Sequence, residues 1–174
     1  MISSQQELLL KQYQERSFVS SILAEETYNY YNFIKNMINI PLIICNSAMV
    51  CINSIITDQD LLKILNIILN SSTGLILSLI SNFKIYENIS LFGKIRVKYT
   101  KLSHLIDSKI TNELEDINIE FIQFIINEYD SITSECECVF PLHIRIKIKN
   151  QYQEKLSLPS SLTADIVECK NNCC

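Results

Sequence analysis

The chain has 174 residues, a net charge of -4 and a mean hydropathy of +0.15, values that indicate one domain at the apolar edge of the soluble range. Because Gly74 and Gly93 are its only glycines, it has no glycine-rich phosphate loop, dinucleotide fingerprint or nucleophile elbow. The usual nucleotide-binding enzymes are therefore disfavoured, and the acidic balance argues against a nucleic-acid-binding protein.

Residues 1–36 predict an N-terminal amphipathic helical region. Ser4 and Glu7 have the spacing of a capping box, and the helical pattern extends from there towards Tyr31. Charged residues interrupt every apolar stretch in this region, so a cleaved signal peptide is not expected. The first apolar run of the chain should therefore be retained.

Two uncharged runs follow, residues 37–56 and residues 64–83. Each has about 20 residues, enough for an α-helix to cross a hydrocarbon core of ~30 Å. Pro41 lies near the start of the first run, where its missing N–H costs least. The alternative is a pair of central helices in a soluble bundle, but the rest of the chain offers little to surround two such helices. We expect an all-α protein with a two-helix transmembrane hairpin over residues 37–83.

The flanks of the hairpin predict its orientation. The turn "TDQDLLK" carries two acids and one lysine, and a tyrosine-rich stretch that suits the headgroup region precedes the first run. The residues after the second run are basic, with Lys84, Lys94, Arg96, Lys98 and Lys101. The positive-inside rule then puts both termini in the cytoplasm, and the five bases are candidates for contact with anionic lipid headgroups.

Each run carries a stripe of polar or small residues. Asn39, Asn46 and Asn53 recur every seven residues on the first run, and Asn66, Asn70, Gly74, Ser78 and Asn82 recur every four on the second. One hypothesis has these side chains lining a water-filled path in an oligomer, and the other has them packing across a close helix–helix contact. The spans contain no ionisable residue, which argues against a proton relay or a selective ion site.

Residues 84–156 predict a cytoplasmic helical region. Apolar positions from Ile85 to Leu114 continue the second run as one long amphipathic helix, and a further helix covers about residues 117–132. The first of these helices is basic and the second acidic, so we expect them to fold back on each other. The stretch "HIRIKIKN" alternates like a strand, but no partner strand is evident, and a helix from Pro141 through "QYQEKL" is predicted instead. Residues 157–174 predict a disordered tail.

The cysteines and histidines form no recognised site. A zinc site would need the tail to fold back, so free thiols are expected, with lipidation of the last two cysteines as the alternative. His104 and His143 stand in no metal-ligand or triad spacing. No catalytic residue, metal or cofactor is expected. The cysteines concerned are Cys136, Cys138, Cys169, Cys173 and Cys174.

The order of a tyrosine-rich helix, "NIPLIICNSAMVCINSI", a short turn, "LNIILNSSTGLILSLISNF" and "KIYENISLFGKIRVKYTKLSHLID" resembles the SLATT family, the two-transmembrane effector domains associated with SMODS and SLOG proteins. The resemblance covers Tyr28 to Asn150 and is strongest to divergent members in large DNA viruses. It implies an oligomeric membrane effector that forms pores when a nucleotide-sensing partner is triggered. The sequence shows no sensor domain of its own, so the expected partners are the lipid bilayer, further copies of the chain and an unidentified sensor or virion protein. A structural or scaffolding role in a viral membrane is the alternative.

Overall fold

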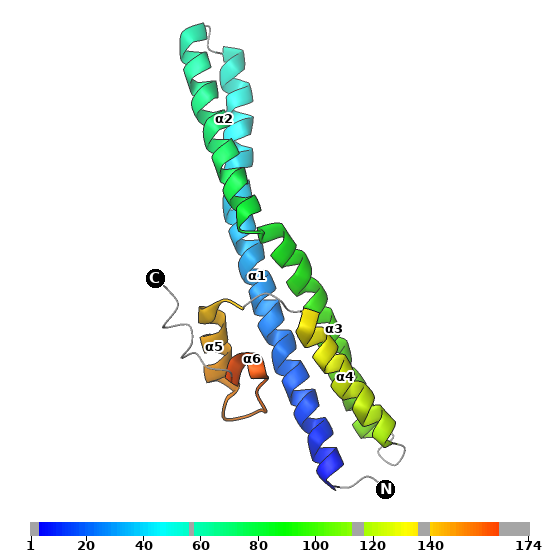
Figure 1. Cartoon of the computed structure of the whole chain (residues 1–174). Coiled ribbons are helices and arrows are strands. Elements are labelled where there is room, and N and C mark those ends of the chain that lie inside the picture. Colours follow the sequence, from blue (N-terminus) through cyan, green and yellow to red (C-terminus); the bar gives the residue numbers. More distant parts are fainter. Residues whose placement is uncertain (1–3, 56–57, 113–116, 136–139, 164–174) are drawn as a thin grey trace. The chain divides into compact units, whose positions relative to one another are not determined.

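The computed structural model describes residues 4–55, 58–112, 117–135 and 140–163, and these residues contain helices and no strand (Figure 1). The all-α prediction is therefore confirmed for this part of the chain. In chain order the helices are α1 (Ser4–Ile55), α2 (Gln59–Asn82), α3 (Ile85–Asn112), α4 (Ile119–Glu135), α5 (Leu142–Tyr152) and α6 (Ser160–Thr163).

The chain divides into two units, which we call the head unit and the hairpin unit. The head unit comprises residues 1–27 and 91–174, and the hairpin unit comprises residues 28–90. Helices α1 and α3 each contribute residues to both units. The boundaries differ from the expected division at residues 36 and 84, because the parts of α1 and α3 nearest the apolar runs belong with the hairpin.

An antiparallel pair, α3 and α4, forms one half of the head unit. The buried residues of both helices recur at alternating spacings of three and four, the repeat that lets two helices interlock along a seam. The ring of Tyr129 on α4 lies 5.7 Å from the ring of Tyr99 on α3, and the Tyr99 hydroxyl is 3.0 Å from Thr133 Oγ1. The buried apolar residues of the two helices in the head unit are Phe92, Ile95, Tyr99, Leu102 and Ile106 on α3 and Ile122, Ile125, Tyr129 and Ile132 on α4. The prediction that these two helices fold back on each other is confirmed.

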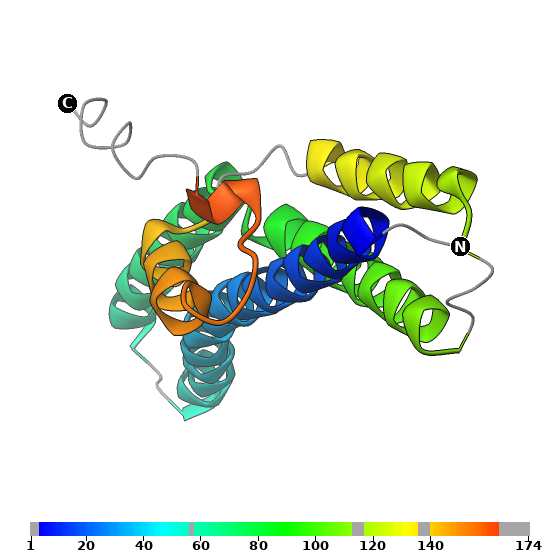
Figure 2. The ribbon, with the colours of Figure 1, turned by 90° about the horizontal axis from the view of Figure 1, so that it is seen from below.

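Helices α5 and α6 lie on one side of the N-terminal part of α1, and α3 and α4 lie on the other (Figures 1 and 2). Lys147 Nζ on α5 donates to Glu26 Oε2 at 2.8 Å, and the Ser157 amide donates to Glu15 Oε2 at the same distance. Arg16 Nε donates to Ser157 Oγ at 3.2 Å. The segment from α5 to α6 is thus held on α1 at two places three helical turns apart.

Of two predictions for the C-terminal part, the helix at α5 is confirmed and the disorder of residues 157–163 is wrong. The stretch "HIRIKIKN" is helical in α5, as predicted, with Ile144 and Ile148 buried at four-residue spacing. Residues 157–163 were expected to be disordered, but Pro159 and Leu162 are buried against the head unit. The contacts with Glu15 and Arg16 that hold this segment come from the other end of the chain. The remainder of the tail, residues 164–174, lies outside the described residues.

Two helix boundaries also differ from those predicted. Helix α1 runs through Pro41 without a break, so the N-terminal helix and the first apolar run form one element rather than two. Conversely, the second run does not continue into one long helix, because α2 ends at Asn82 and α3 begins at Ile85. Lys84 adopts a left-handed conformation with φ 50°, and its amide donates to Ser81 O at 3.0 Å, which closes the end of α2.

Candidate functional site: the apolar hairpin

The hairpin unit pairs the C-terminal part of α1 with α2 around a short turn (Figure 1). Asp58 caps α2, because its Oδ1 accepts from the amides of Asp60 and Leu61 at 3.1 and 3.2 Å. Most of the residues of the two apolar runs that are at least half-buried recur at spacings of three, four and seven. They are Ile38, Asn39, Leu42, Met49 and Ile52 on α1 and Leu62, Leu65, Asn66, Leu69, Thr73, Ile76 and Ile80 on α2. The seam between the two helices is therefore mainly apolar, and this heptad spacing is a signal that the sequence analysis missed.

The asparagine stripe of α1 runs along the border of this seam. Near the turn, Asn66 Nδ2 on α2 donates to Asn53 Oδ1 at 3.3 Å. At the other end, Asn39 Nδ2 donates to the hydroxyl of Tyr86 at 3.0 Å. Asn46, between them, is exposed and bonds to no described residue. Two of the three asparagines are thus satisfied inside one hairpin.

The polar stripe of α2 faces outward beyond Asn66. Asn70, Ser78 and Asn82 are exposed, and their side chains make no hydrogen bond to any described residue. A Cβ added at Gly74 would meet nothing within 4 Å. Gly74 therefore does not mark a close approach of α1 and α2, so the packing hypothesis fails for this residue within a single hairpin. The sequence grouped these residues with Asn66, but the structure separates them.

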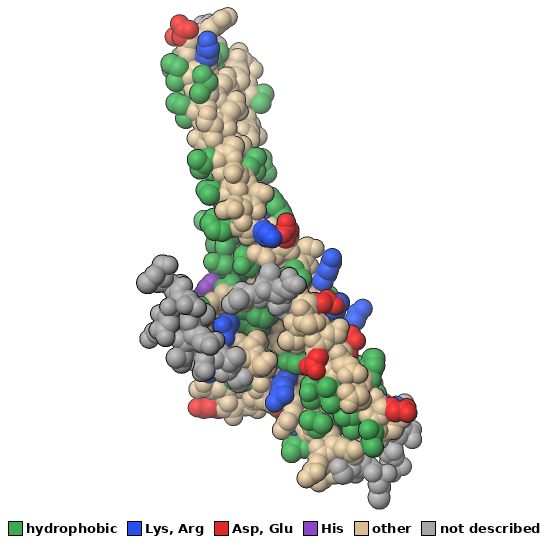
Figure 3. Space-filling view, viewed as in Figure 1, with side chains coloured by type: hydrophobic (Ala, Val, Ile, Leu, Met, Phe, Trp, Pro, Cys, Tyr) green, Lys and Arg blue, Asp and Glu red, His purple; other side chains and the backbone are tan. Residues whose placement is uncertain are grey.

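The rest of the outer surface of the hairpin is largely apolar, interrupted by exposed serines such as Ser47, Ser54 and Ser71. Ile43, Val50 and Leu75 are 64%, 68% and 64% exposed, and several other branched side chains of both helices are exposed to a similar degree. Charged side chains appear at the tip of the hairpin, and none appears along its shaft on the face shown (Figure 3). Between Met37 and Phe83 the only charges are Asp58, Asp60 and Lys63, which flank the start of α2.

A shallow groove of about 370 Å³ opens between the two helices beside Pro41. Leu42 and Cys45 line it from α1, and Leu69 and Ile76 line it from α2. Ser72 and Thr73 supply its hydroxyl groups. The lining of the groove contains no carboxylate, histidine or lysine.

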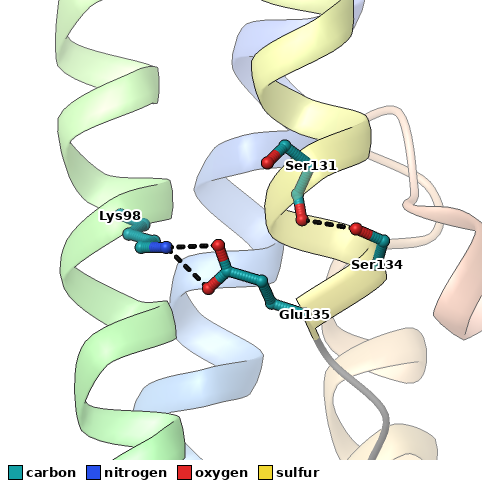
Figure 4. Close-up of polar contacts among 4 residues, drawn as sticks. All are labelled: Lys98, Ser131, Ser134 and Glu135. Carbon is teal, nitrogen blue, oxygen red and sulfur yellow. Dashed lines mark hydrogen bonds and ion pairs between the residues drawn. The ribbon is translucent and has the colours of Figure 1, made fainter.

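The five basic residues after the second run have different surroundings. Lys98 Nζ reaches both carboxylate oxygens of Glu135 on α4, at 2.5 and 2.6 Å (Figure 4). Arg96 pairs with Glu25 on α1 at 3.4 Å. Lys84 lies 3.9 Å from Glu87 in an exposed pair, whereas Lys94 and Lys101 are exposed. Arg96 and Lys98 therefore stabilise the contacts of α3 with its neighbours, which leaves them less available to lipid headgroups than the sequence suggested.

The described residues contain no group of three or more histidine, cysteine or acidic side chains arranged to hold a metal ion. Cys45 and Cys51 are exposed free thiols on the hairpin. The two cysteine clusters considered in the sequence, at residues 136–138 and 169–174, lie outside the described ranges. His104 lies in the head unit beside a pocket that Gln14 and Asp107 also line, and Gln14 Nε2 donates to Asp107 Oδ1 there at 2.7 Å.

Helices α1 and α2 are each long and apolar enough to cross a membrane. Only 6% of each apolar stretch is fully buried, unlike the core helices of a soluble protein. Comparison with protein-family models, curated proteins and solved structures finds no match to this chain. The surface of the hairpin is thus the main guide to function.

Proposed function

We propose that this protein is an integral membrane protein that inserts its hairpin unit across a bilayer, with both termini in the cytoplasm. The observation that carries the proposal is the outer surface of the hairpin, where apolar side chains are exposed along the whole shaft and charges stand only near its ends. A soluble protein rarely exposes a continuous apolar surface of this extent. A bilayer would cover it, with the turn on the far side.

We further propose that hairpins associate and that the assembly perturbs the membrane. Asn46, Asn70 and Asn82 point outward with unsatisfied amide groups, and such groups in hydrocarbon are costly unless they meet water or another helix. A neighbouring hairpin can supply these partners, and Gly74 leaves space for its backbone to come close. The resemblance to SLATT effectors supports this reading, with an unidentified sensor or virion protein as trigger.

A specific observation favours a second candidate, in which the hairpin only anchors a structural or scaffolding protein. Asn39 and Asn53 already have partners within one hairpin, and the spans carry no ionisable group that would attract an ion. A chain of this kind needs no oligomer. The head unit would then be the functional part, displayed at the membrane surface.

Reconstitution into dye-loaded liposomes separates the two candidates. We expect the full chain to resist extraction by alkaline carbonate, to form a high oligomer in detergent and to release dye. Asn70→Leu should lower both oligomer and release, because it removes an outward amide, whereas Ile67→Leu should change neither. A carbonate-resistant monomer or dimer that releases nothing would support the anchor instead, since two spans per chain cannot enclose a pore in so small an assembly.

A further inference from the structure

Helix α5 has a composition unlike the rest of the head unit. It carries Arg145, Lys147 and Lys149 and no acidic residue, whereas α4 carries four acids and no base. Ile144, Arg145 and Ile148 face inward and are buried. The opposite face exposes two large apolar side chains, Leu142 at 44% and Ile146 at 39%.

Basic side chains border these two apolar residues. His143 precedes Ile146 by about one helical turn, Lys147 follows it directly, and the half-buried Lys149 follows three residues later. Lys147 is paired with Glu26, yet its side chain remains 57% exposed. Lysine stems can lie along an apolar surface while the ammonium groups reach outward. Two exposed apolar side chains beside lysines can meet the boundary between anionic headgroups and acyl chains.

The contacts of α5 place it at one particular end of the head unit. The Phe140 ring, just before α5, lies 5.2 Å from the Phe92 ring at the start of the head-unit part of α3. Lys147 meets Glu26 on α1, and Arg96 of α3 meets the adjacent Glu25. Both chain connections to the hairpin unit, at residues 27 and 91, leave the head unit from this end. Only residues 84–90 separate this end of α3 from the second apolar run.

We propose that the outer face of α5, formed by Leu142 and Ile146 and bordered by His143, Lys147 and Lys149, docks on the anionic surface of a phospholipid bilayer. The inference rests on the proposed insertion of the hairpin, which would hold this end of the head unit close to lipid. Charge complementarity points to the partner: α5 itself has bases and no acid, Glu26 of α1 pairs with Lys147, and each lysine near an anionic surface strengthens attraction about fivefold. On α3, Arg96 and Lys98 are likewise engaged in ion pairs, whereas Lys94 and Lys101 are exposed.

The natural absence of tryptophan provides a clean reporter. We would introduce Leu142→Trp or Ile146→Trp into the full chain and reconstitute it in vesicles of phosphatidylcholine, alone or with about one-third phosphatidylglycerol. Phe124→Trp on acidic α4 is the matched control, since Phe124 is also half exposed. We expect the tryptophan fluorescence at positions 142 and 146 to shift to the blue and to be quenched by brominated acyl chains only in the anionic vesicles. The tryptophan fluorescence at position 124 should not change.

A second pair of variants tests the charge. Lys149→Glu in the Ile146→Trp background should reduce the anionic increment of quenching at least fivefold, while Lys11→Glu, an equal change on an exposed lysine at the other end of the head-unit part of α1, should not. Lys147 is left intact because its loss would also break the pair with Glu26.

Three outcomes would overturn the proposal. These are no quenching at 142 and 146, equal quenching in both vesicles, or a blue shift that follows protein concentration rather than lipid charge, which would assign the face to a second copy. Carbonate extraction of the same samples reports on the hairpin separately. A carbonate-resistant chain without anionic quenching contradicts only the α5 proposal, and an extractable chain contradicts the insertion.

Discussion

At the residue scale, Tyr129 shows how burial changes a titration in the head unit. Its ring lies edge-on to Tyr13 of α1 at 5.4 Å and also contacts Tyr99 of α3. Burial raises the pKa of Tyr129 above its ordinary 10.0, against the opposing effects of a hydrogen bond with Ser20 and of the charge on Arg16. The neutral phenol is therefore favoured by folding.

This shift predicts a loss of stability in alkali. Because the folded pKa is raised, the stabilisation is complete below pH ~10 and is lost as pH rises through the folded pKa. Tyr129→Phe removes the titrating hydroxyl, so it should flatten the decline in alkali. Thermal unfolding followed by circular dichroism at a series of pH values measures this. Tyr152→Phe is the control, and equal alkaline declines in both variants would contradict the assignment.

At the scale of elements, Gly74 faces outward, so a substitution there tests the association of several hairpins without disturbing the folding of one. Gly74→Leu should leave the hairpin helical, since a side chain there meets open space and leucine favours helix by about 1 kcal/mol over glycine. If hairpins pack through this stripe, the same change should disrupt their association, whereas Leu75→Ile should not. Crosslinking in detergent measures the oligomer. Equal crosslinking of both variants, with unchanged helicity, would show that Gly74 is not at an interface.

Much of the element pattern could be predicted from periodicity and charge. The apolar runs, α4 and the helical state of α5 follow from local spacing and from the lack of a partner strand. Other features depend on contacts distant in sequence. Residues 157–163 are ordered by Glu15 and Arg16, and no local signal identifies that pairing.

The residues of the candidate site were predicted from the sequence, but the direction in which their side chains point was not. The Asn and Ser residues at regular spacing suggested one polar face, yet the two helices meet through Leu42, Met49 and Leu69, and most of the α2 stripe turns away. A helix with a seven-residue apolar repeat and a four-residue polar repeat presents two different faces, and the larger apolar side chains bury more area. Which way each polar side chain points could therefore be known only from the packed pair of helices. Pro41 was expected near the start of the first span, but its one missing hydrogen bond does not interrupt α1, which runs through it.

At the scale of the whole molecule, topology can be tested with glycosylation. Asn88-Ile89-Ser90 forms an acceptor sequon on α3. Asn88 Nδ2 donates to Phe83 O at 3.4 Å. With both termini in the cytoplasm, Asn88 should stay unmodified in a eukaryotic host, while a sequon in a lengthened "TDQDLLK" turn should be glycosylated. Glycosidase-sensitive shifts on gels report both sites.

The reverse pattern, with glycan on Asn88 and none on the turn, would invert the orientation and place the head unit outside the cytoplasm. Glycan on neither site, together with carbonate extraction, would indicate a soluble bundle. The lengthened turn is the more informative site, since closeness to the bilayer can by itself leave Asn88 bare.

The left-handed Lys84 has a consequence for where in a cell such a hairpin would reside. This conformation costs a residue with a Cβ about 1 kcal/mol or more, and it lies directly after the uncharged run, which ends at Phe83, one residue beyond the end of α2. The run from Ile64 to Phe83 then measures about 30 Å. Hydrocarbon thickness is about 27 Å in the endoplasmic reticulum and about 32–33 Å in a sterol-rich plasma membrane. If the hairpin spans a bilayer as proposed, a span ended so sharply would not lengthen into α3. It would then tilt in the thinner bilayer and fall short of the thicker one, so membrane thickness would influence which membrane holds it.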